Sequence, residues 1–333
     1  MIEYKIANYR WDRDRLEDFL QDFQLKLEED VEYSIIAYDN DRIVGTGSVS
    51  KNVLKCFAID PNYQGYNITG TIVTKLMEYE AERGIFHLFI FTKPENKKIF
   101  SSLGFKEVAM VEDVCLLDNN IETLKDYLEE LKPYAKKGNI ATIVMNANPM
   151  TKGHLALVQK ASQESDYVHL FLVREDSSVF PFKDRYHIVK ESVKDLKNVF
   201  VHPGNEYIIS KNTFPTYFYK DENIVIRSYS ELDLKIFCEY FAKTLYITKR
   251  YVGTEPLDIV TRTYNEAMKE ILPKYGIELE VVERFKESEE LISASKVRTL
   301  LRDNNLSKAF SYLPEATIEY LKSEQGQKIM KEL

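Results

Sequence analysis

The sequence predicts an α/β protein in which an N-terminal α+β domain precedes a doubly wound, Rossmann-like parallel-sheet domain. The length of 333 residues exceeds what one hydrophobic core usually supports, which favours two domains. Strand patterns linked by short turns dominate the first third of the chain, whereas strand and helix patterns alternate from residue 139 onward. Such alternation is typical of a parallel sheet, whose ligands bind at the carboxyl ends of the strands. We therefore expect a ligand site in the second domain.

The first predicted domain covers residues 1–118. Short apolar runs rich in Val, Ile, Phe and Tyr predict strands, and one segment with apolar residues at helical spacing predicts a helix. The predicted strands are 33–39, 42–50, 52–59 and 86–92, and the predicted helix is 68–84. Residues 119–138 are predicted to form a connector helix and linker, because the helical pattern is interrupted by Pro133 and Gly138.

The second predicted domain covers residues 139–333. Its expected strands are 139–147, 167–173, 198–204, 248–253 and 278–285, and its expected helices are 152–164, 182–195, 231–245, 261–273 and 295–303. The aromatic-rich segment 213–222 favours a place in the core, with a channel for a substrate as the alternative.

Charge and composition exclude several kinds of partner. The chain has 45 Lys and Arg against 53 Asp and Glu, a net charge of -8, which argues against nucleic acid and anionic membranes as general partners. The N-terminus has no apolar signal segment, and no run approaches the roughly 18 apolar residues of a membrane span. We therefore expect a cytoplasmic protein. Cys56, Cys115 and Cys238 are far apart and form no metal-ligand pattern, so we expect buried thiols and no protein-bound metal site.

The segment NPMTKGH lies where the first strand of the second domain turns into a helix. A helix N-terminus presents free backbone N–H groups to a phosphate, and Gly153 allows the chain to approach it closely. His154 can stabilise the charge that develops as pyrophosphate leaves. The alternative is a histidine that only caps the helix. The residues of this turn assigned to ATP binding are Asn146, Asn148, Pro149, Thr151, Gly153 and His154.

A second phosphate-binding pattern, ISASKVR, starts another helix near the C-terminus. The hydroxyls of Ser293 and Ser295 can accept or donate hydrogen bonds there, and Lys296 and Arg298 supply positive charge for the β- and γ-phosphates. By itself, this pattern is also typical of an ordinary N-cap.

Five further residues are weaker candidates. Arg185 could reach a phosphate, with a solvated surface arginine as the alternative, and Gly253 could contact the adenosine or form a plain turn. Arg262, Tyr264 and Asn265 could define a pocket for a second substrate, which the resemblance described below implies to be acetate or a thiol, with helix capping as the alternative.

The two phosphate patterns together resemble the HxGH and ISSTxxR signatures of the nucleotidyltransferase superfamily. Thr151 stands at the first His of that signature, His154 matches the second, and Arg298 matches the final Arg. The sequence from NPMTKGH to ISASKVRTLL also resembles that of the citrate lyase ligases, over nearly all of residues 139–303.

The resemblance implies a reaction. ATP and acetate would give acetyl adenylate and pyrophosphate, and the acetyl group would then pass to the thiol of the phosphoribosyl-dephospho-coenzyme A group on the acyl-carrier (γ) subunit of citrate lyase. It implies Mg²⁺ held mainly by the ATP phosphates. We assign catalysis to Lys152, His154 and Arg298. The alternative is an adenylyltransferase that makes a nucleotide cofactor, fused to an independent N-acetyltransferase.

The first domain resembles the acetyl-CoA-dependent N-acetyltransferases, and the segment from CFAIDPNYQGYNITG to LGFKEV carries this resemblance. Gln64 and Gly65 match the pyrophosphate loop of that superfamily, but Asn67 and Thr69 replace its small residues. Side chains at these positions should crowd a pyrophosphate. We therefore expect a degenerate coenzyme A loop that does not serve amine acetylation, in a domain that helps to dock the carrier arm.

Overall fold

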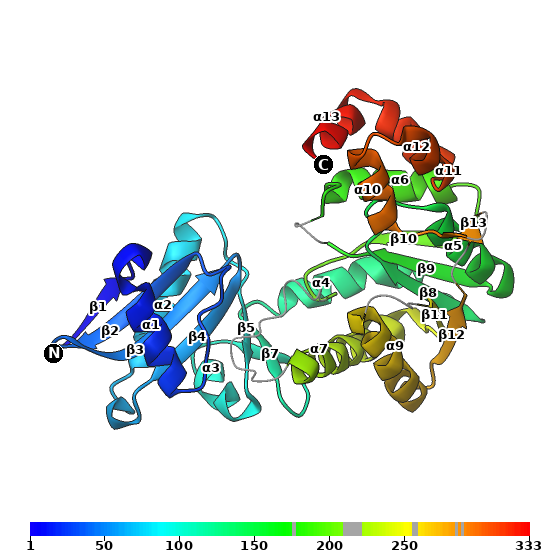
Figure 1. Ribbon diagram of the computed structural model, residues 1–333. Coiled ribbons are helices and arrows are strands. Elements are labelled where there is room, and N and C mark those ends of the chain that lie inside the picture. The colour runs from blue at the N-terminus through cyan, green and yellow to red at the C-terminus, as the bar shows by residue number, and fades with distance from the viewer. Residues whose placement is uncertain (175–177, 209–221, 255–258, 284–285, 288–289) are drawn as a thin grey trace. The chain divides into compact units, whose positions relative to one another are not determined.

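The computed structural model describes residues 1–174, 178–208, 222–254, 259–283, 286–287 and 290–333 (Figure 1). The chain divides into two compact units. Unit 1 contains residues 1–126 and the described part of 213–232, and unit 2 contains the described parts of 127–212 and 233–333. The aromatic segment 213–222 lies outside the described residues except for its last residue. The domain boundaries expected from the sequence stay a prediction.

Unit 1 contains a seven-stranded sheet in the order β1-β2-β3-β4-β5-β7-β6 (Figure 1). All neighbouring strands are antiparallel except β4 and β5, which are parallel. The strands are β1 (Ile2–Ile6), β2 (Tyr33–Asp39), β3 (Arg42–Ser50), β4 (Val53–Ile59), β5 (Phe89–Thr92), β6 (Lys106–Met110) and β7 (Cys115–Asp118). The four strands expected from the sequence are present, and β1, β6 and β7 were not expected.

Helix α2 (Ile68–Glu82) packs on this sheet because its apolar residues fall on one face. Ile68, Ile72 and Leu76 recur every four residues and are all buried. The helix comes so close to β3 that a Cβ on Gly47 would lie 2.6 Å from the Cγ2 of Ile72. A glycine is therefore required at this contact. The other helices of the unit are α1 (Tyr9–Asp22) and α3 (Lys97–Ser101).

Unit 2 contains a five-stranded parallel sheet in the order β10-β9-β8-β11-β12, as the sequence predicts (Figure 1). The strands are β8 (Ile140–Met145), β9 (Tyr167–Leu172), β10 (Val199–Pro203), β11 (Lys249–Gly253) and β12 (Glu278–Val282). The strand order reverses direction between β8 and β11. Ligands of doubly wound sheets bind at the carboxyl ends of the strands at such a reversal.

Helices follow the strands of unit 2 as expected. They are α5 (Lys152–Glu164), α6 (Phe182–Val193), α8 (Lys243–Leu245), α9 (Ile259–Ile271) and α10 (Ala294–Arg302), together with the end of α7 (Glu222–Ile236), whose residues up to Leu232 belong to unit 1. A π-helical turn over Phe237–Ala242 joins α7 to α8, so the helix expected at 231–245 is longer and less regular than predicted. Helices α11 (Leu306–Ser311), α12 (Glu315–Lys322) and α13 (Glu324–Glu332) were not expected, and they build a second apolar cluster with α10. A short hairpin, β13 (Lys286–Glu287) and β14 (Glu290–Leu291), precedes α10.

The expected connector is helix α4 (Glu122–Leu131) followed by a 3-10 turn. It is not an exposed linker, because Tyr127 and Leu131 are buried and the hydroxyl of Tyr127 donates a 2.6 Å hydrogen bond to the carbonyl of Pro203. The second half of α4 is therefore part of unit 2.

The three cysteines are free and buried, as expected. Burial raises the pKa of Cys56 and of Cys238 to about 12, so both thiols are protonated and inert at neutral pH. Among the described residues, no helix is long and apolar enough to cross a membrane.

Candidate nucleotide site

The loop between β8 and α5 is fixed by hydrogen bonds from segments far away in the sequence. The side chain of Asn148 accepts a 3.0 Å hydrogen bond from the backbone N–H of Phe180. The carbonyl of Met150 accepts one of 3.0 Å from the hydroxyl of Thr317 on α12. Residues Asn148 and Pro149 are joined by a cis peptide bond. The loop thus has a defined shape at the carboxyl end of the central strand.

His154 and Thr151 form a reciprocal cap at the start of α5. The hydroxyl of Thr151 accepts a hydrogen bond from the backbone N–H of His154 at 3.3 Å, and the backbone N–H of Thr151 donates to Nδ1 of His154 at 3.1 Å. Because Nδ1 accepts this bond, it carries a lone pair, and the ring proton of the neutral imidazole must be on Nε2. His154 is therefore both a capping residue and a possible donor through Nε2.

Helix α10 is capped in the same way. The hydroxyl of Ser293 accepts a 3.1 Å hydrogen bond from the backbone N–H of Lys296, whose ammonium lies 5.2 Å from the ring centre of Tyr312. Ser295 is exposed in the first turn. Arg298 donates from Nη1 to the carbonyl of Asn148, and burial lowers its pKa. This bond joins the two phosphate patterns, which are 150 residues apart in the sequence.

Arg185 is fully buried, which excludes the alternative of a solvated surface arginine. It donates hydrogen bonds from Nε to the carbonyl of Phe180 at 2.9 Å, and from Nη1 to the carbonyl of Val173 at 3.0 Å and to the carbonyl and the side-chain oxygen of Asn146, both at 2.7 Å. These contacts hold the ends of β8 and β9 together. Direct contact between Arg185 and ATP stays a prediction.

Lys152 and Gly153 are the first two residues of α5. The backbone N–H of Lys152 donates a 2.9 Å hydrogen bond to the carbonyl of Tyr312, in the turn after α11. The C-terminal helices therefore support the start of α5 as well as the loop before it.

The candidates on β11 and α9 belong to a neighbouring group. Asn265 is nearly buried, and its amide donates a 3.2 Å hydrogen bond to the carbonyl of Gly253 at the end of β11. Tyr264 donates its hydroxyl hydrogen to Asp233, and burial raises its pKa above the ordinary range. Arg262 is exposed. A pocket for acetate or a thiol at these three residues stays a prediction.

Sequence reasoning did not find two members of this group, Asp233 and Arg250. Arg250 is buried, donates to the hydroxyl of Tyr264 at 3.3 Å, and places its guanidinium 4.6 Å from the ring centre of Phe237. The sequence did contain a signal for Arg250, because it is a charged residue inside an expected parallel strand and the central strands of such sheets are usually apolar. These contacts fix α9 against β11.

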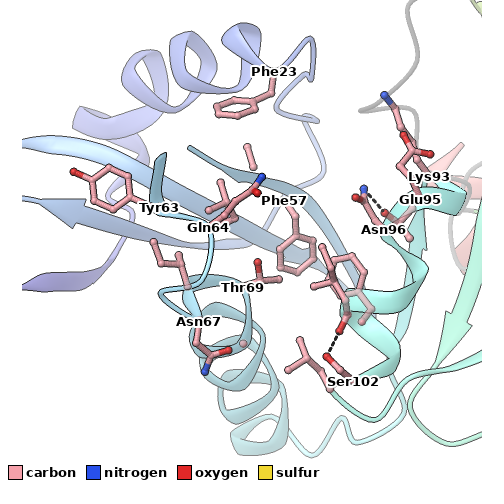
Figure 2. A pocket seen from close by; sticks show the side chains of 18 of the residues that line it. Phe23, Phe57, Tyr63, Gln64, Asn67, Thr69, Lys93, Glu95, Asn96 and Ser102 are labelled. Atoms are coloured by element: carbon pink, nitrogen blue, oxygen red, sulfur yellow. Dashed lines mark hydrogen bonds between the residues drawn. The ribbon is translucent and has the colours of Figure 1, made fainter. Parts of the chain in front are cut away.

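The coenzyme A loop residues lie in unit 1, at a cleft with a volume of about 700 Å³ (Figure 2). Gln64, Gly65, Asn67 and Thr69 all line this cleft. Asn67 adopts a left-handed backbone conformation, with φ of 56°, which is the region that glycine usually occupies. Asn67 and Thr69 both line the cleft, and whether their side chains crowd a pyrophosphate stays a prediction.

Comparisons with known proteins agree with both units. The family "Citrate lyase ligase C-terminal domain" matches residues 140–321, and the "Acetyltransferase (GNAT) domain" family matches residues 10–115. The chain is 42% identical over 315 residues to "[Citrate [pro-3S]-lyase] ligase" of Klebsiella pneumoniae, covering 93% of this chain and 92% of that protein.

Two further relatives are similar to the whole chain or to part of it. The chain is 41% identical over 312 residues to the protein of that name from Escherichia coli K12, covering 92% of this chain and 89% of that protein. A phosphopantetheine adenylyltransferase of Streptococcus sanguinis is 46% identical over 67 residues, covering 20% of this chain and 37% of that protein. The expected fold class, an N-acetyltransferase-like domain followed by a nucleotidyltransferase-like domain, is confirmed. The chain belongs to the citrate lyase ligase family.

Proposed function

We propose that this protein is an ATP-dependent acid–thiol ligase that acetylates the thiol of the phosphoribosyl-dephospho-coenzyme A group on the carrier subunit of citrate lyase. The family membership supports the ligase activity, and the geometry of unit 2 supports a nucleotide site. Acetate and the carrier thiol are the two acceptors, and AMP and pyrophosphate are the products.

The first step is adenylation of acetate. A carboxylate oxygen of acetate attacks the α-phosphorus of ATP, the bond from this phosphorus to the bridging oxygen of the β-phosphate breaks, and pyrophosphate leaves. Negative charge grows on the leaving group and on the α-phosphate oxygens. The groups expected to stabilise this charge are the Nε2 hydrogen of His154, the guanidinium of Arg298 and the positive N-terminal ends of the helices α5 and α10.

The second step is transfer to sulfur. The thiol loses its proton to water, the sulfur attacks the carbonyl carbon of acetyl adenylate, and AMP leaves with the electron pair of the broken carbon–oxygen bond. The cysteines of the chain take no part, because all three are buried and the raised pKa values of Cys56 and Cys238 keep those two thiols protonated at neutral pH. The thioester therefore forms on the carrier arm and not on this protein.

Mg²⁺ would enter with ATP. The described residues contain no group of three or more His, Cys, Asp or Glu side chains suited to a metal ion. The loop and the two helix starts offer amides, hydroxyls and cations, which suit phosphate oxygens better than a divalent cation. The phosphates and water are therefore the expected ligands of Mg²⁺, and the protein binds the complex through the phosphates.

One observation carries the proposal: the hydrogen bond from Arg298 to the carbonyl of Asn148, which joins the two phosphate patterns. Exchange of labelled pyrophosphate into ATP tests it. We expect exchange that requires acetate, because only acetyl adenylate formation releases pyrophosphate reversibly in this scheme. Exchange without acetate, with AMP retained in a stable small-molecule product, would instead support an adenylyltransferase fused to an independent N-acetyltransferase.

A further inference from the structure

One peptide group of the loop before α5 carries two hydrogen bonds that join α12 to α5. This group links Met150 to Thr151. Its carbonyl accepts the 3.0 Å hydrogen bond from the hydroxyl of Thr317, and its N–H donates the 3.1 Å hydrogen bond to Nδ1 of His154. The atoms of a peptide group lie in one plane, so the orientation of the carbonyl also determines the direction of the N–H. A rotation of this group would therefore weaken both bonds.

The bond to Nδ1 determines which nitrogen of His154 carries the proton. A backbone N–H can only donate, so it requires a lone pair on Nδ1 and places the ring proton of the neutral imidazole on Nε2. The hydroxyl of Thr151 lies 3.1 Å from the same Nδ1, but a hydroxyl can donate or accept and would tolerate either tautomer. The orientation of the peptide group is therefore the feature that selects the tautomer.

Thr317 is in a position to hold this peptide group in place. Thr317 and Met150 are both fully buried, so bulk water cannot replace the hydroxyl as the donor to the carbonyl. A buried carbonyl without a donor is costly. If the hydroxyl were removed, we expect the peptide group to rotate toward another donor, which would turn its N–H away from His154.

We propose that Thr317 is a positioning residue for adenylation. Its hydroxyl orients the peptide group between Met150 and Thr151, and this group keeps the imidazole of His154 in the tautomer that donates from Nε2. Thr317 acts only through His154 and needs no contact with a substrate. The inference rests on the proposed function, because that function assigns His154 to the charge that develops as pyrophosphate leaves.

Exchange kinetics of two Thr317 variants test the proposal. Thr317→Val removes the hydroxyl and keeps the shape of the side chain, whereas Thr317→Ser keeps the hydroxyl and removes the methyl group. The matched control is Thr142→Val. Thr142 is equally buried, and its hydroxyl also donates a 3.0 Å hydrogen bond to a backbone carbonyl, that of His169 on the neighbouring strand. Urea unfolding shows whether each variant is folded under the assay conditions, and Thr317→Ala offers the same comparison if Thr317→Val does not fold.

We expect Thr317→Val to lower the kcat of acetate-dependent pyrophosphate exchange by about tenfold while the KM for ATP stays within about twofold, because a donor to the transition state is displaced. The loss should not exceed the roughly 100-fold expected when the Nε2 donor itself is removed. Thr317→Ser should restore the rate to within about threefold of that of the unmodified protein, and Thr142→Val should stay within about twofold of it.

Two further measurements separate a positioning role from a general loss of structure. In a protein that already carries His154→Asn, Thr317→Val should lower exchange by less than about twofold, because a residue that acts through His154 has no further effect once the Nε2 donor is gone. Nitrogen-15 NMR of the imidazole rings reports the tautomer directly, and the signal of His154 is the one absent from His154→Asn. It should show protonated Nε2 in the unmodified protein and a larger fraction of protonated Nδ1 in Thr317→Val.

Any of four results would overturn the proposal: undiminished exchange in a folded Thr317→Val protein, an equal loss in Thr142→Val, effects of His154→Asn and Thr317→Val that multiply, or an unchanged tautomer of His154 in Thr317→Val. Failure of the proposed function looks different. It appears as a lack of acetate-dependent exchange in the unmodified protein, and the NMR comparison still decides whether Thr317 sets the tautomer of His154.

Discussion

His154 has two hydrogen-bonding roles that different substitutions can separate. Nδ1 accepts the N–H of Thr151 at 3.1 Å, so the ring proton of the neutral imidazole is on Nε2, which we propose to donate to a phosphate. In His154→Asn, the amide oxygen of the new side chain lies near the position of Nδ1, but no atom takes the position of Nε2. The rate of acetate-dependent pyrophosphate exchange should therefore fall about 100-fold or more, which corresponds to an increase of about 2.7 kcal/mol in the activation free energy. The free energy of unfolding should change by less than about 0.5 kcal/mol.

His154→Gln should behave in the opposite way. Its amide nitrogen can replace the Nε2 donor, but its side chain has no acceptor at Nδ1, so the cap is lost at about 1 kcal/mol of stability. Exchange should then fall by less than about tenfold. His154→Ala should show both losses. Urea unfolding and exchange assays on the three variants measure the two effects. Near-normal exchange in a folded His154→Asn protein would refute the donor role.

Three further predictions concern the same unit. Arg298→Ala should raise the KM for ATP and slow exchange more than Lys296→Ala does, because the Arg298 guanidinium donates to the carbonyl of Asn148 in the loop. Steady-state exchange kinetics with a larger effect at Lys296 would contradict this. Arg185→Met should leave three carbonyls without this donor and lower the free energy of unfolding by about 3 kcal/mol, seen as a lower Tm in calorimetry. An unchanged Tm would show that these contacts do not stabilise the fold. Burial lowers the pKa of His169 to about 4 and of His202 to about 3, so both side chains take up protons more readily in the unfolded chain than in the folded protein. The free energy of unfolding should therefore fall as the pH drops from about 6.5 toward 4. A variant with Gln at both positions should show a smaller decrease when the free energy of unfolding is measured with urea.

Local patterns were enough to predict the parallel sheet and the position of His154. Strand β8 is a short apolar run, and the turn into α5 has a side-chain cap, so nearby residues determine both. The long-range contacts could not be predicted. Neither the bond from Thr317 to the loop nor the burial of Arg185 has a local signal, because both depend on how distant helices pack.

The conformation of the loop before α2 also depends on a residue that the motif does not include. Asn67 adopts a left-handed conformation that glycine usually occupies, and the missing side chain of Gly70 provides the space for its amide. The sequence motif alone could not predict this arrangement, because it depends on the residue three positions later.

The hydrogen bond between Arg298 and Asn148 also has a consequence for how the protein is made. It closes a chain segment of 150 residues, and the bond from Thr317 to Met150 closes one of 167. Contacts with such large sequence separation form late, because the entropy of closing the loop must be met first. A nascent chain that has emerged only as far as α9 contains the complete NPMTKGH segment but lacks both bonds. Nucleotide binding should therefore begin only after the last helices leave the ribosome, and ATP should stabilise the completed chain but not such an intermediate.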